Sequence, residues 1–382
     1  MGERSFVTLK GEKIFTNENY GRGSIFSELR IEEFGQFLDL RKRGISRIKD
    51  IKGLAELKYL KRLDLGVNNI EKVEGLSELK NLTRLDLRRN KINSIDELDL
   101  QCLEALSLEQ NRLQAIRGLE NLPNLRGLSL NDNNLTKIEG LDTLSKLESL
   151  SLSKNNITRI QGLDNLKKLR TLDLLRNNVR KIEGLDNLIK LGKLYFSYNS
   201  ISEIEGLENN RLLTELKLDH NSITRIKNIG NLRELNYLNL ANNKISKIEG
   251  LDSLLKLEIL DLSSNNISTI ENVNHLTRLI NLFLQYNRIK RIENMERLNQ
   301  LEELELTHNA ITSVPKIDWL ENPNVQYQIV YFSDNPLEDI SELQNFGKVL
   351  IYVEEDPKYE QLRDIYNMEY FDTHLIALYK KE

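Results

Sequence analysis

Hydrophobic and polar residues follow one repeating order along most of the chain. The motif Leu-x-Leu-x-x-Asn, with Phe196 in place of the second Leu in one copy, recurs with its Asn at positions 68, 90, 111, 133, 155, 177, 199, 221, 243, 265, 287 and 309. Ten of the eleven intervals between these residues span 22 positions and one spans 21. Relative to the Asn, apolar residues occupy positions −14, −11, −8, −5, −3, +2 and +5, except at Glu97 and Asn210. This regularity predicts a solenoid, in which each repeat packs only against its neighbours.

The spacing of residues inside one repeat predicts its secondary-structure elements. Two leucines separated by one residue point to the same side of a short strand. The Asn follows this strand at a turn, where its amide can bond the backbone of neighbouring turns. The Leu-x-x-Leu-x-x-Leu stretches have the period of a 3₁₀ segment. We therefore expect an α/β leucine-rich repeat solenoid, a right-handed horseshoe or arc. Its concave face carries a parallel β-sheet, and its convex face carries short 3₁₀ or extended segments.

Atypical sequence flanks the repeats and predicts two caps. We expect an N-terminal cap, a repeat array and a C-terminal cap at residues 1–37, 38–340 and 341–382. In the N-terminal cap, residues 5–9 and 13–16 predict a hairpin. Ser27 predicts the start of a helix that carries Leu29, Ile31, Phe34 and Phe37. In the C-terminal cap, residues 348–353 predict a strand, and Asp356 with Pro357 predicts a helix through Asn367.

The repeat also carries a resemblance to known proteins. The segment from Asn243 to Leu251 reads Asn-Lys-Ile-Ser-Lys-Ile-Glu-Gly-Leu and resembles the 22-residue repeats of the protein phosphatase 1 regulatory subunit family. Bacterial internalins share this repeat length. We find neither a secretory signal nor an LPxTG-type anchor in the sequence and therefore favour the intracellular branch. The resemblance covers the repeats and implies a protein-interaction scaffold with a regulatory role.

Positions −6, −4 and −2 from each Asn are expected on the concave face. From Leu175 onward these positions carry bulky apolar and aromatic side chains with interspersed carboxylates. Aromatic residues are enriched at protein interfaces, so we predict a partner-binding site here. The alternative is that aromatic residues suit strands and stack on their cross-strand neighbours. The carboxylates favour a partner with basic character. Tyr198 and Tyr286 lie beside these columns, immediately before the Asn of their repeats. The predicted site comprises Asp173, Leu175, Tyr195, Tyr198, Tyr237, Ile259, Asp261, Phe283, Tyr286, Glu305 and Tyr331.

Charge leaves a second hypothesis open. The 382 residues include 54 Lys and Arg against 58 Asp and Glu, a net charge of −4, which argues against a strongly basic nucleic-acid-binding protein. However, Arg62, Arg84 and Arg88 belong to an N-terminal Arg-rich patch. This patch predicts, as the alternative function, a reader of RNA or phosphoproteins. Asp64 and Asp86 belong to the same predicted strands and weaken that hypothesis.

Residues typical of catalysis and metal binding are sparse. The single cysteine, Cys102, excludes an intrachain disulfide and a cysteine-based zinc cluster. The four histidines lack metal-ligand spacing. No window approaches the ~18 consecutive apolar residues of a transmembrane helix. We therefore expect a cytoplasmic, non-enzymatic monomer without metal or cofactor, which binds a protein partner and neither a membrane nor, in the favoured hypothesis, nucleic acid.

Overall fold

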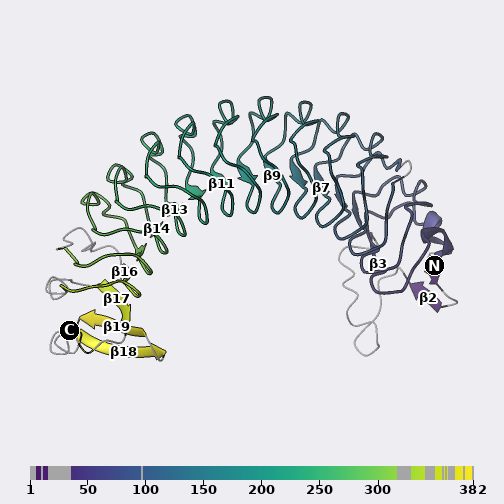
Figure 1. Cartoon of the computed structure of the whole chain (residues 1–382). Coiled ribbons are helices and arrows are strands. Elements are labelled where there is room, and N and C mark those ends of the chain that lie inside the picture. Colours follow the sequence, from purple (N-terminus) through teal and green to yellow (C-terminus); the bar gives the residue numbers. More distant parts are fainter. Residues whose placement is uncertain are drawn as a thin grey trace. The chain divides into compact units, whose positions relative to one another are not determined.

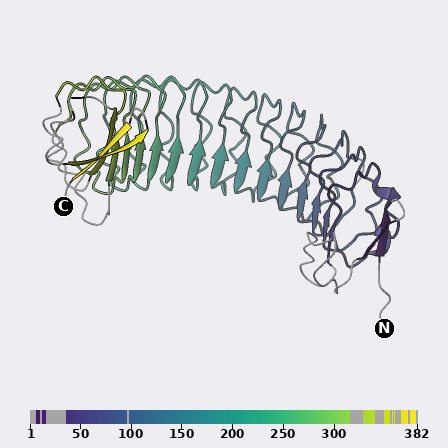
Figure 2. The same cartoon turned by 90° about the horizontal axis from the view of Figure 1, so that it is seen from below.

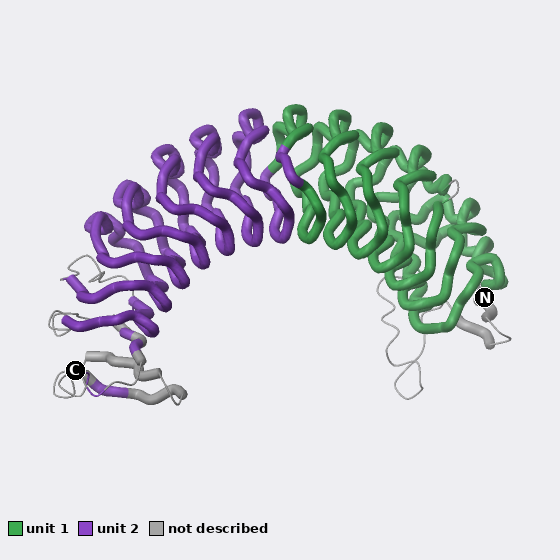
Figure 3. Tube along the Cα trace, in the orientation of Figure 1, with its two compact units in different colours: residues 1–179, 183–191 green, residues 180–182, 192–382 purple. Residues whose placement is uncertain are grey.

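The computed structural model shows two compact units. Unit 1 comprises residues 1–179 and 183–191, and unit 2 comprises residues 180–182 and 192–382 (Figure 3). Within each unit, the repeat strands lie side by side in a row (Figures 1 and 2). The described residues are 6–9, 12–15, 36–95, 98–315, 328–339, 349–354, 357, 359, 366–372 and 375–380.

Unit 1 begins with an antiparallel hairpin and continues as a parallel sheet. The hairpin pairs Phe6 with Phe15 and confirms the sequence prediction. Phe37, expected on a helix, is instead the first residue of a strand, because it pairs in register with Arg62. The rest of the predicted N-terminal helix lies outside the described residues. The strands are β1 (Phe6–Leu9), β2 (Glu12–Phe15), β3 (Phe37–Asp39), β4 (Arg62–Asp64), β5 (Arg84–Asp86), β6 (Ala105–Ser107), β7 (Gly127–Ser129), β8 (Ser149–Ser151) and β9 (Thr171–Asp173).

Unit 2 continues the parallel pattern and ends in antiparallel strands. Strand β17 confirms the strand predicted at residues 348–353, and it pairs with β16 and with β19. Tyr366 and Asn367 belong to β18, so the predicted helix was wrong at this end, where pairing with β19 satisfies the backbone. The strands are β10 (Lys193–Tyr195), β11 (Glu215–Lys217), β12 (Tyr237–Asn239), β13 (Ile259–Asp261), β14 (Asn281–Phe283), β15 (Glu303–Glu305), β16 (Gln328–Tyr331), β17 (Val349–Glu354), β18 (Tyr366–Asp372) and β19 (Leu375–Lys380).

The core of each unit is a stack of aliphatic side chains. Leucines at position −5 align across the parallel ladder, as Leu63, Leu85 and Leu106 do in unit 1. These three residues and their −3 counterparts are at most 2% exposed. The register persists across the one 21-residue interval, so its missing position falls in the connection and not in the sheet. The alternation of buried and surface positions along the strands β4 to β15 is therefore as the sequence predicts.

The Asn at position 0 links adjacent repeats as expected. In unit 1, Asn155 Nδ2 donates to the carbonyl oxygens of Leu130 and Leu152, both at 3.0 Å. Its Oδ1 accepts the backbone N–H of Leu135 at 3.0 Å. Three buried backbone groups from two repeats thus find partners on one side chain. The same pattern recurs at the equivalent Asn residues of both units.

The connections opposite the strands are single turns. Leu144 N–H donates to the Leu141 oxygen and Leu147 N–H to the Leu144 oxygen, at 3.0 and 2.9 Å, which confirms the period of three. Longer 3₁₀ segments within the described residues are η1 (Ile48–Asp50) and η2 (Leu54–Glu56). The glycine in the Ile-Glu-Gly-Leu segment is required for a steric reason. Gly140 has φ +68, and a Cβ there would lie 2.3 Å from the Ile116 oxygen.

One backbone feature is absent from the sequence predictions. In every described repeat the residue at position −1, immediately before the Asn, has φ between 52° and 57°. None of these residues is glycine, and they include Val67, Tyr198 and His220. The left-handed conformation turns the chain out of the strand, and the adjacent Asn hydrogen bonds hold it there. The side chains at position −1 therefore lie at the edge of each sheet, one per repeat.

Candidate protein-binding surface

Aromatic and aliphatic residues form a surface along the sheet of unit 2. We call Tyr195, Tyr198, Tyr237, Ile259, Phe283, Tyr286 and Tyr331 the aromatic surface. The parallel register places Tyr195, Phe283 and Tyr331 in the −4 column, on β10, β14 and β16. Tyr237 pairs directly with Ile259 in the −6 column. All seven side chains are half-buried or exposed, so each retains area that a partner could cover.

A network of charged residues fixes one end of the aromatic surface. Lys217 Nζ lies 5.1 Å from the Tyr195 ring centroid and 5.2 Å from that of Tyr237, within cation–π range. The Tyr195 hydroxyl donates to Glu215 Oε2 at 3.0 Å. Burial acts to raise the pKa of Glu215, but hydrogen bonds from Lys193, Lys217 and Tyr195 outweigh it, so the pKa is lowered. Cross-strand packing, the alternative explanation for these aromatics, is thus present, and it also holds the rings in place.

Two tyrosines of the aromatic surface stack on histidines of the following repeat. The Tyr198 and His220 ring centroids are 3.8 Å apart, and those of Tyr286 and His308 are 4.3 Å apart. His220 Nδ1 lies 3.0 Å from Asp219 Oδ2. His308 Nε2 lies 2.9 Å from Asp334 Oδ2.

Tyr198 is 41% exposed and Tyr286 is 55% exposed, more than the strand aromatics. The sequence predicted both tyrosines as site residues, whereas for the two histidines it showed only that they lack metal-ligand spacing. The structure instead makes each histidine the support of a tyrosine. A Tyr and a His at position −1 of consecutive repeats is the signal that sequence reasoning missed.

The carboxylates predicted in the site turn toward their own backbone. Asp261 Oδ1 accepts hydrogen bonds from Ser263 N at 3.0 Å and Ser263 Oγ at 2.7 Å. Glu305 Oε1 accepts the Thr307 N–H at 2.9 Å. Burial raises the pKa of both carboxyls, against the effect of these hydrogen bonds. Both groups therefore support the turn that follows the strand, a role that position −4 could have suggested, since Asp and Asn side chains often bond the backbone two residues on.

The two remaining predicted site residues lie in unit 1. Asp173 is the last residue of β9, and its Oδ1 accepts the Leu175 N–H at 2.9 Å. Leu175 is half-buried at position −2. Asp173 thus repeats the turn-supporting role of Asp261, while the other nine predicted residues belong to unit 2.

The N-terminal arginines divide into two groups. Arg88 Nε lies 3.3 Å from Asp86 Oδ2, and Arg41 Nε lies 3.3 Å from Asp64 Oδ2. Among the described residues, the guanidinium groups of Arg62 and Arg84 form neither an ion pair nor a hydrogen bond. The Arg-rich patch is therefore partly neutralised by its own aspartates.

The described parts of the chain hold neither a cluster of metal ligands nor a membrane-spanning helix. Within them, no three His, Cys, Asp or Glu side chains gather as a metal site would require. No helix among these residues has the length and apolar character to cross a membrane. Cys102 is exposed.

Comparison with known proteins defines the class. The family described as leucine-rich repeats (2 copies) matches residues 60–100, 101–143, 145–190, 211–253 and 233–275, about half of the chain. The chain therefore belongs to the leucine-rich repeat family, in agreement with the parallel strands and stacked leucines of each unit. The comparison with curated proteins gives no match.

Solved structures of bacterial proteins resemble the chain. An internalin of Listeria monocytogenes is 28% identical, with a TM-score of 0.66, over 80% of this chain and 86% of that one. A leucine-rich repeat protein of Leptospira interrogans is 25% identical, with a TM-score of 0.68, over 81% and 92%. The functional domain of the Listeria protein InlJ is 25% identical, with a TM-score of 0.67, over 84% and 69%, and includes a cysteine ladder. This chain has one cysteine and so lacks the residues for such a ladder.

Proposed function

We propose that the protein is a non-enzymatic interaction scaffold that binds a protein partner through the aromatic surface of unit 2. The supporting observation is the set of half-buried rings along the sheet, flanked by the more exposed Tyr198 and Tyr286. Tyrosine and phenylalanine bury large apolar areas with few rotatable bonds, which suits them to the centre of interfaces. The cation–π and stacking contacts hold the rings before a partner arrives, which lowers the ordering cost of binding.

The proposal extends to partner chemistry and cellular role. Charged side chains lie among the rings of this surface, with Lys217 and Glu215 at one end and Asp261 and Glu305 farther along the sheet. A partner with apolar anchors and some basic side chains therefore suits it. We also keep the expectations of a cytoplasmic location, a monomeric state and a regulatory role, the last implied by the resemblance to phosphatase regulatory subunits.

A pull-down with paired variants tests the proposed surface. Tyr195→Ala/Phe283→Ala removes two rings, while Leu212→Ala/Leu255→Ala removes exposed apolar side chains of the same unit, 54% and 56% exposed, from the connecting turns. We expect one protein captured by the wild-type chain to be lost with the ring variant and kept with the turn variant. Equal capture by the wild-type chain and the ring variant would contradict the assignment, provided that circular dichroism shows both chains folded.

The alternative function, a reader of RNA or phosphoproteins, has weaker support. Arg88 is occupied by Asp86, and the Asp39, Asp64 and Asp86 carboxylates lie in a row on β3, β4 and β5, where they would oppose a chain of phosphates. Of the three arginines named for this alternative, Arg62 and Arg84 favour it. A salt titration against RNA separates the two functions, because RNA binding weakens steeply with salt.

A further inference from the structure

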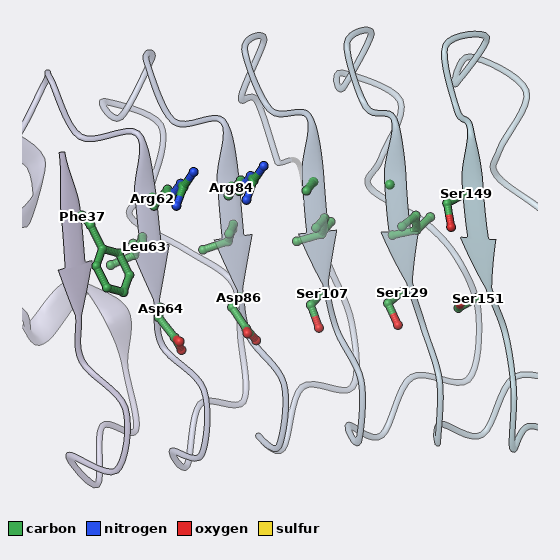
Figure 4. Close-up of a pocket in the computed structure, with 15 residues that line it drawn as sticks. Phe37, Arg62, Leu63, Asp64, Arg84, Asp86, Ser107, Ser129, Ser149 and Ser151 are labelled. Atoms are coloured by element: carbon green, nitrogen blue, oxygen red, sulfur yellow. The ribbon is translucent and has the colours of Figure 1, made fainter. Parts of the chain in front are cut away.

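A shallow groove crosses the sheet of unit 1, with a volume of about 370 Å³ (Figure 4). Its −6 row begins with Phe37, which is followed by two arginines, and its −4 row begins with two aspartates. Small side chains follow in both rows. At Gly127, nothing lies within 4 Å of an added Cβ, so the floor is open there. The lining residues of the −6 row are Phe37, Arg62, Arg84, Ala105, Gly127 and Ser149, and those of the −4 row are Asp64, Asp86, Ser107, Ser129 and Ser151.

The two arginines of the groove are adjacent and like-charged. Arg62 pairs with Arg84 in the parallel register, so strand spacing separates their backbones by about 4.8 Å. Like charges on neighbouring strands destabilise a sheet. The following repeats place Ala105 and Gly127 at the same position, so the fold does not require a cation there. A bound anion would relieve this repulsion.

The aspartates of the groove do not supply that anion. Asp64 Oδ1 accepts the Gly66 N–H, and Asp86 Oδ1 accepts the Arg88 N–H, both at 2.9 Å. Figure 4 shows the Arg62 and Arg84 side chains at one end of their strands and Asp64 and Asp86 at the other. Both guanidinium groups therefore remain available to an external carboxylate, which arginine binds with two parallel hydrogen bonds.

We infer that this groove binds an extended, acidic peptide segment, with one Glu or Asp side chain seated between Arg62 and Arg84. From β4 to β8 the floor spans roughly 19 Å, about six residues of extended chain. The small side chains let the peptide backbone approach the sheet. A single carboxylate can contact the two arginines without lying beside the aspartate row. A polyphosphate would lie beside both the arginines and the aspartates, and the aspartates would repel it. The inference uses residues of unit 1 alone and does not depend on the aromatic surface.

Peptide arrays test the groove directly. Seven-residue peptides with varied flanks, each made with Glu, Gln or phosphoserine at the centre, are probed with the labelled full chain. The best Glu peptide is then titrated in solution by fluorescence anisotropy. We expect Glu peptides to bind more tightly than their Gln counterparts, and Arg62→Gln/Arg84→Gln to weaken binding about tenfold or more.

Matched variants separate charge, shape and folding. Lys167→Gln/Lys168→Gln removes the same charge from exposed positions outside the groove and should leave affinity unchanged. Gly127→Leu fills the open floor without a charge change and should weaken binding. Thermal melts establish that each variant is folded, and Arg62→Lys/Arg84→Lys should retain part of the affinity.

The proposal is overturned if Glu and Gln peptides bind equally, or if folded Arg62→Gln/Arg84→Gln binds as the wild type does. It is also overturned if phosphoserine peptides or a single-stranded RNA 20-mer bind through these arginines more tightly than every Glu peptide. Loss of the unit 2 partner with Tyr195→Ala/Phe283→Ala is a separate result and leaves this test unaffected.

Discussion

The ring of Tyr198 lies nearly parallel to the ring of His220, with an angle of 14° between their planes. Both residues have φ above 50°, which places their side chains at the same edge of consecutive strands. Tyr286 and His308 repeat the arrangement with an angle of 23°. The left-handed residue in each repeat thus places side chains of consecutive repeats close enough for rings to stack. Such a stack occurs at Tyr198 and at Tyr286, and in both cases the tyrosine remains exposed.

A double-mutant cycle measures the energy of this stack. We expect Tyr198→Ala and His220→Ala to be coupled by about 1 kcal/mol in the free energy of unfolding, as for other stacked rings. Tyr198→Ala combined with His308→Ala provides the control, because these residues do not share a stack, and their effects should add within about 0.5 kcal/mol. Chemical denaturation gives all the values. Additive effects for Tyr198 and His220 would show that the stack contributes nothing.

The left-handed position also predicts a stabilising substitution. Val67 has φ 57, a conformation in which β-branched side chains are strained. Asn tolerates it, and Asn242 occupies the equivalent position with φ 53. We therefore expect Val67→Asn to raise the free energy of unfolding by about 1 kcal/mol and Asn242→Val to lower it by a similar amount. Denaturant unfolding measures both, and a loss of stability in Val67→Asn would contradict the strain argument.

Much of the fold followed from the sequence because the repeat encodes it redundantly. The spacing of Leu141, Leu150 and Asn155 recurs from repeat to repeat. The strand register, the buried leucines and the hydrogen bonds of the Asn side chains all follow from it. The ends lack this redundancy. The Asp-Pro pair at residues 356–357 favours a helix locally, yet Asn367 lies in β18, because pairing with β19 is a long-range interaction that no local pattern encodes.

The candidate site was predictable in position but not in detail. Period-two alternation placed Tyr195 and Phe283 on the sheet surface, as the structure shows. The roles of Asp261 and His220 depend on the conformation of the turn after each strand, which gives each side chain a backbone group or a ring as neighbour. Such contacts arise between repeats or two residues apart, so composition and spacing alone did not reveal them.

The asparagine ladder should be costly to interrupt. Asn155→Ala removes the partners of the Leu130 and Leu152 carbonyls and of the Leu135 N–H. Buried backbone groups without partners each cost about 1–3 kcal/mol, so we expect a loss of about 3 kcal/mol in the free energy of unfolding. Asn156→Ala, at the adjacent exposed position, should change stability by less than about 0.5 kcal/mol. Equal losses of unfolding free energy in the two variants would show that the hydrogen bonds of Asn155 do not stabilise the fold.

Asp261 predicts a stability difference that depends on pH. Burial raises its pKa in the folded chain above the ordinary 3.8, so the ionised carboxylate is unfavourable when folded. Asn239 on the preceding strand accepts the equivalent backbone N–H at 2.9 Å without a charge. Asp261→Asn should keep the Ser263 hydrogen bonds and raise the free energy of unfolding at pH 7.

The sign of this effect fixes its pH profile. As pH falls through the raised pKa, Asp261 takes up a proton in the folded chain before the unfolded chain does, so the wild type gains stability relative to Asp261→Asn. The advantage of the variant should therefore shrink toward pH 4 and vanish below 3.8, the ordinary Asp value. Denaturant unfolding of both chains from pH 3 to pH 7 measures it. A constant difference across this range would mean that Asp261 acts through packing rather than through its charge.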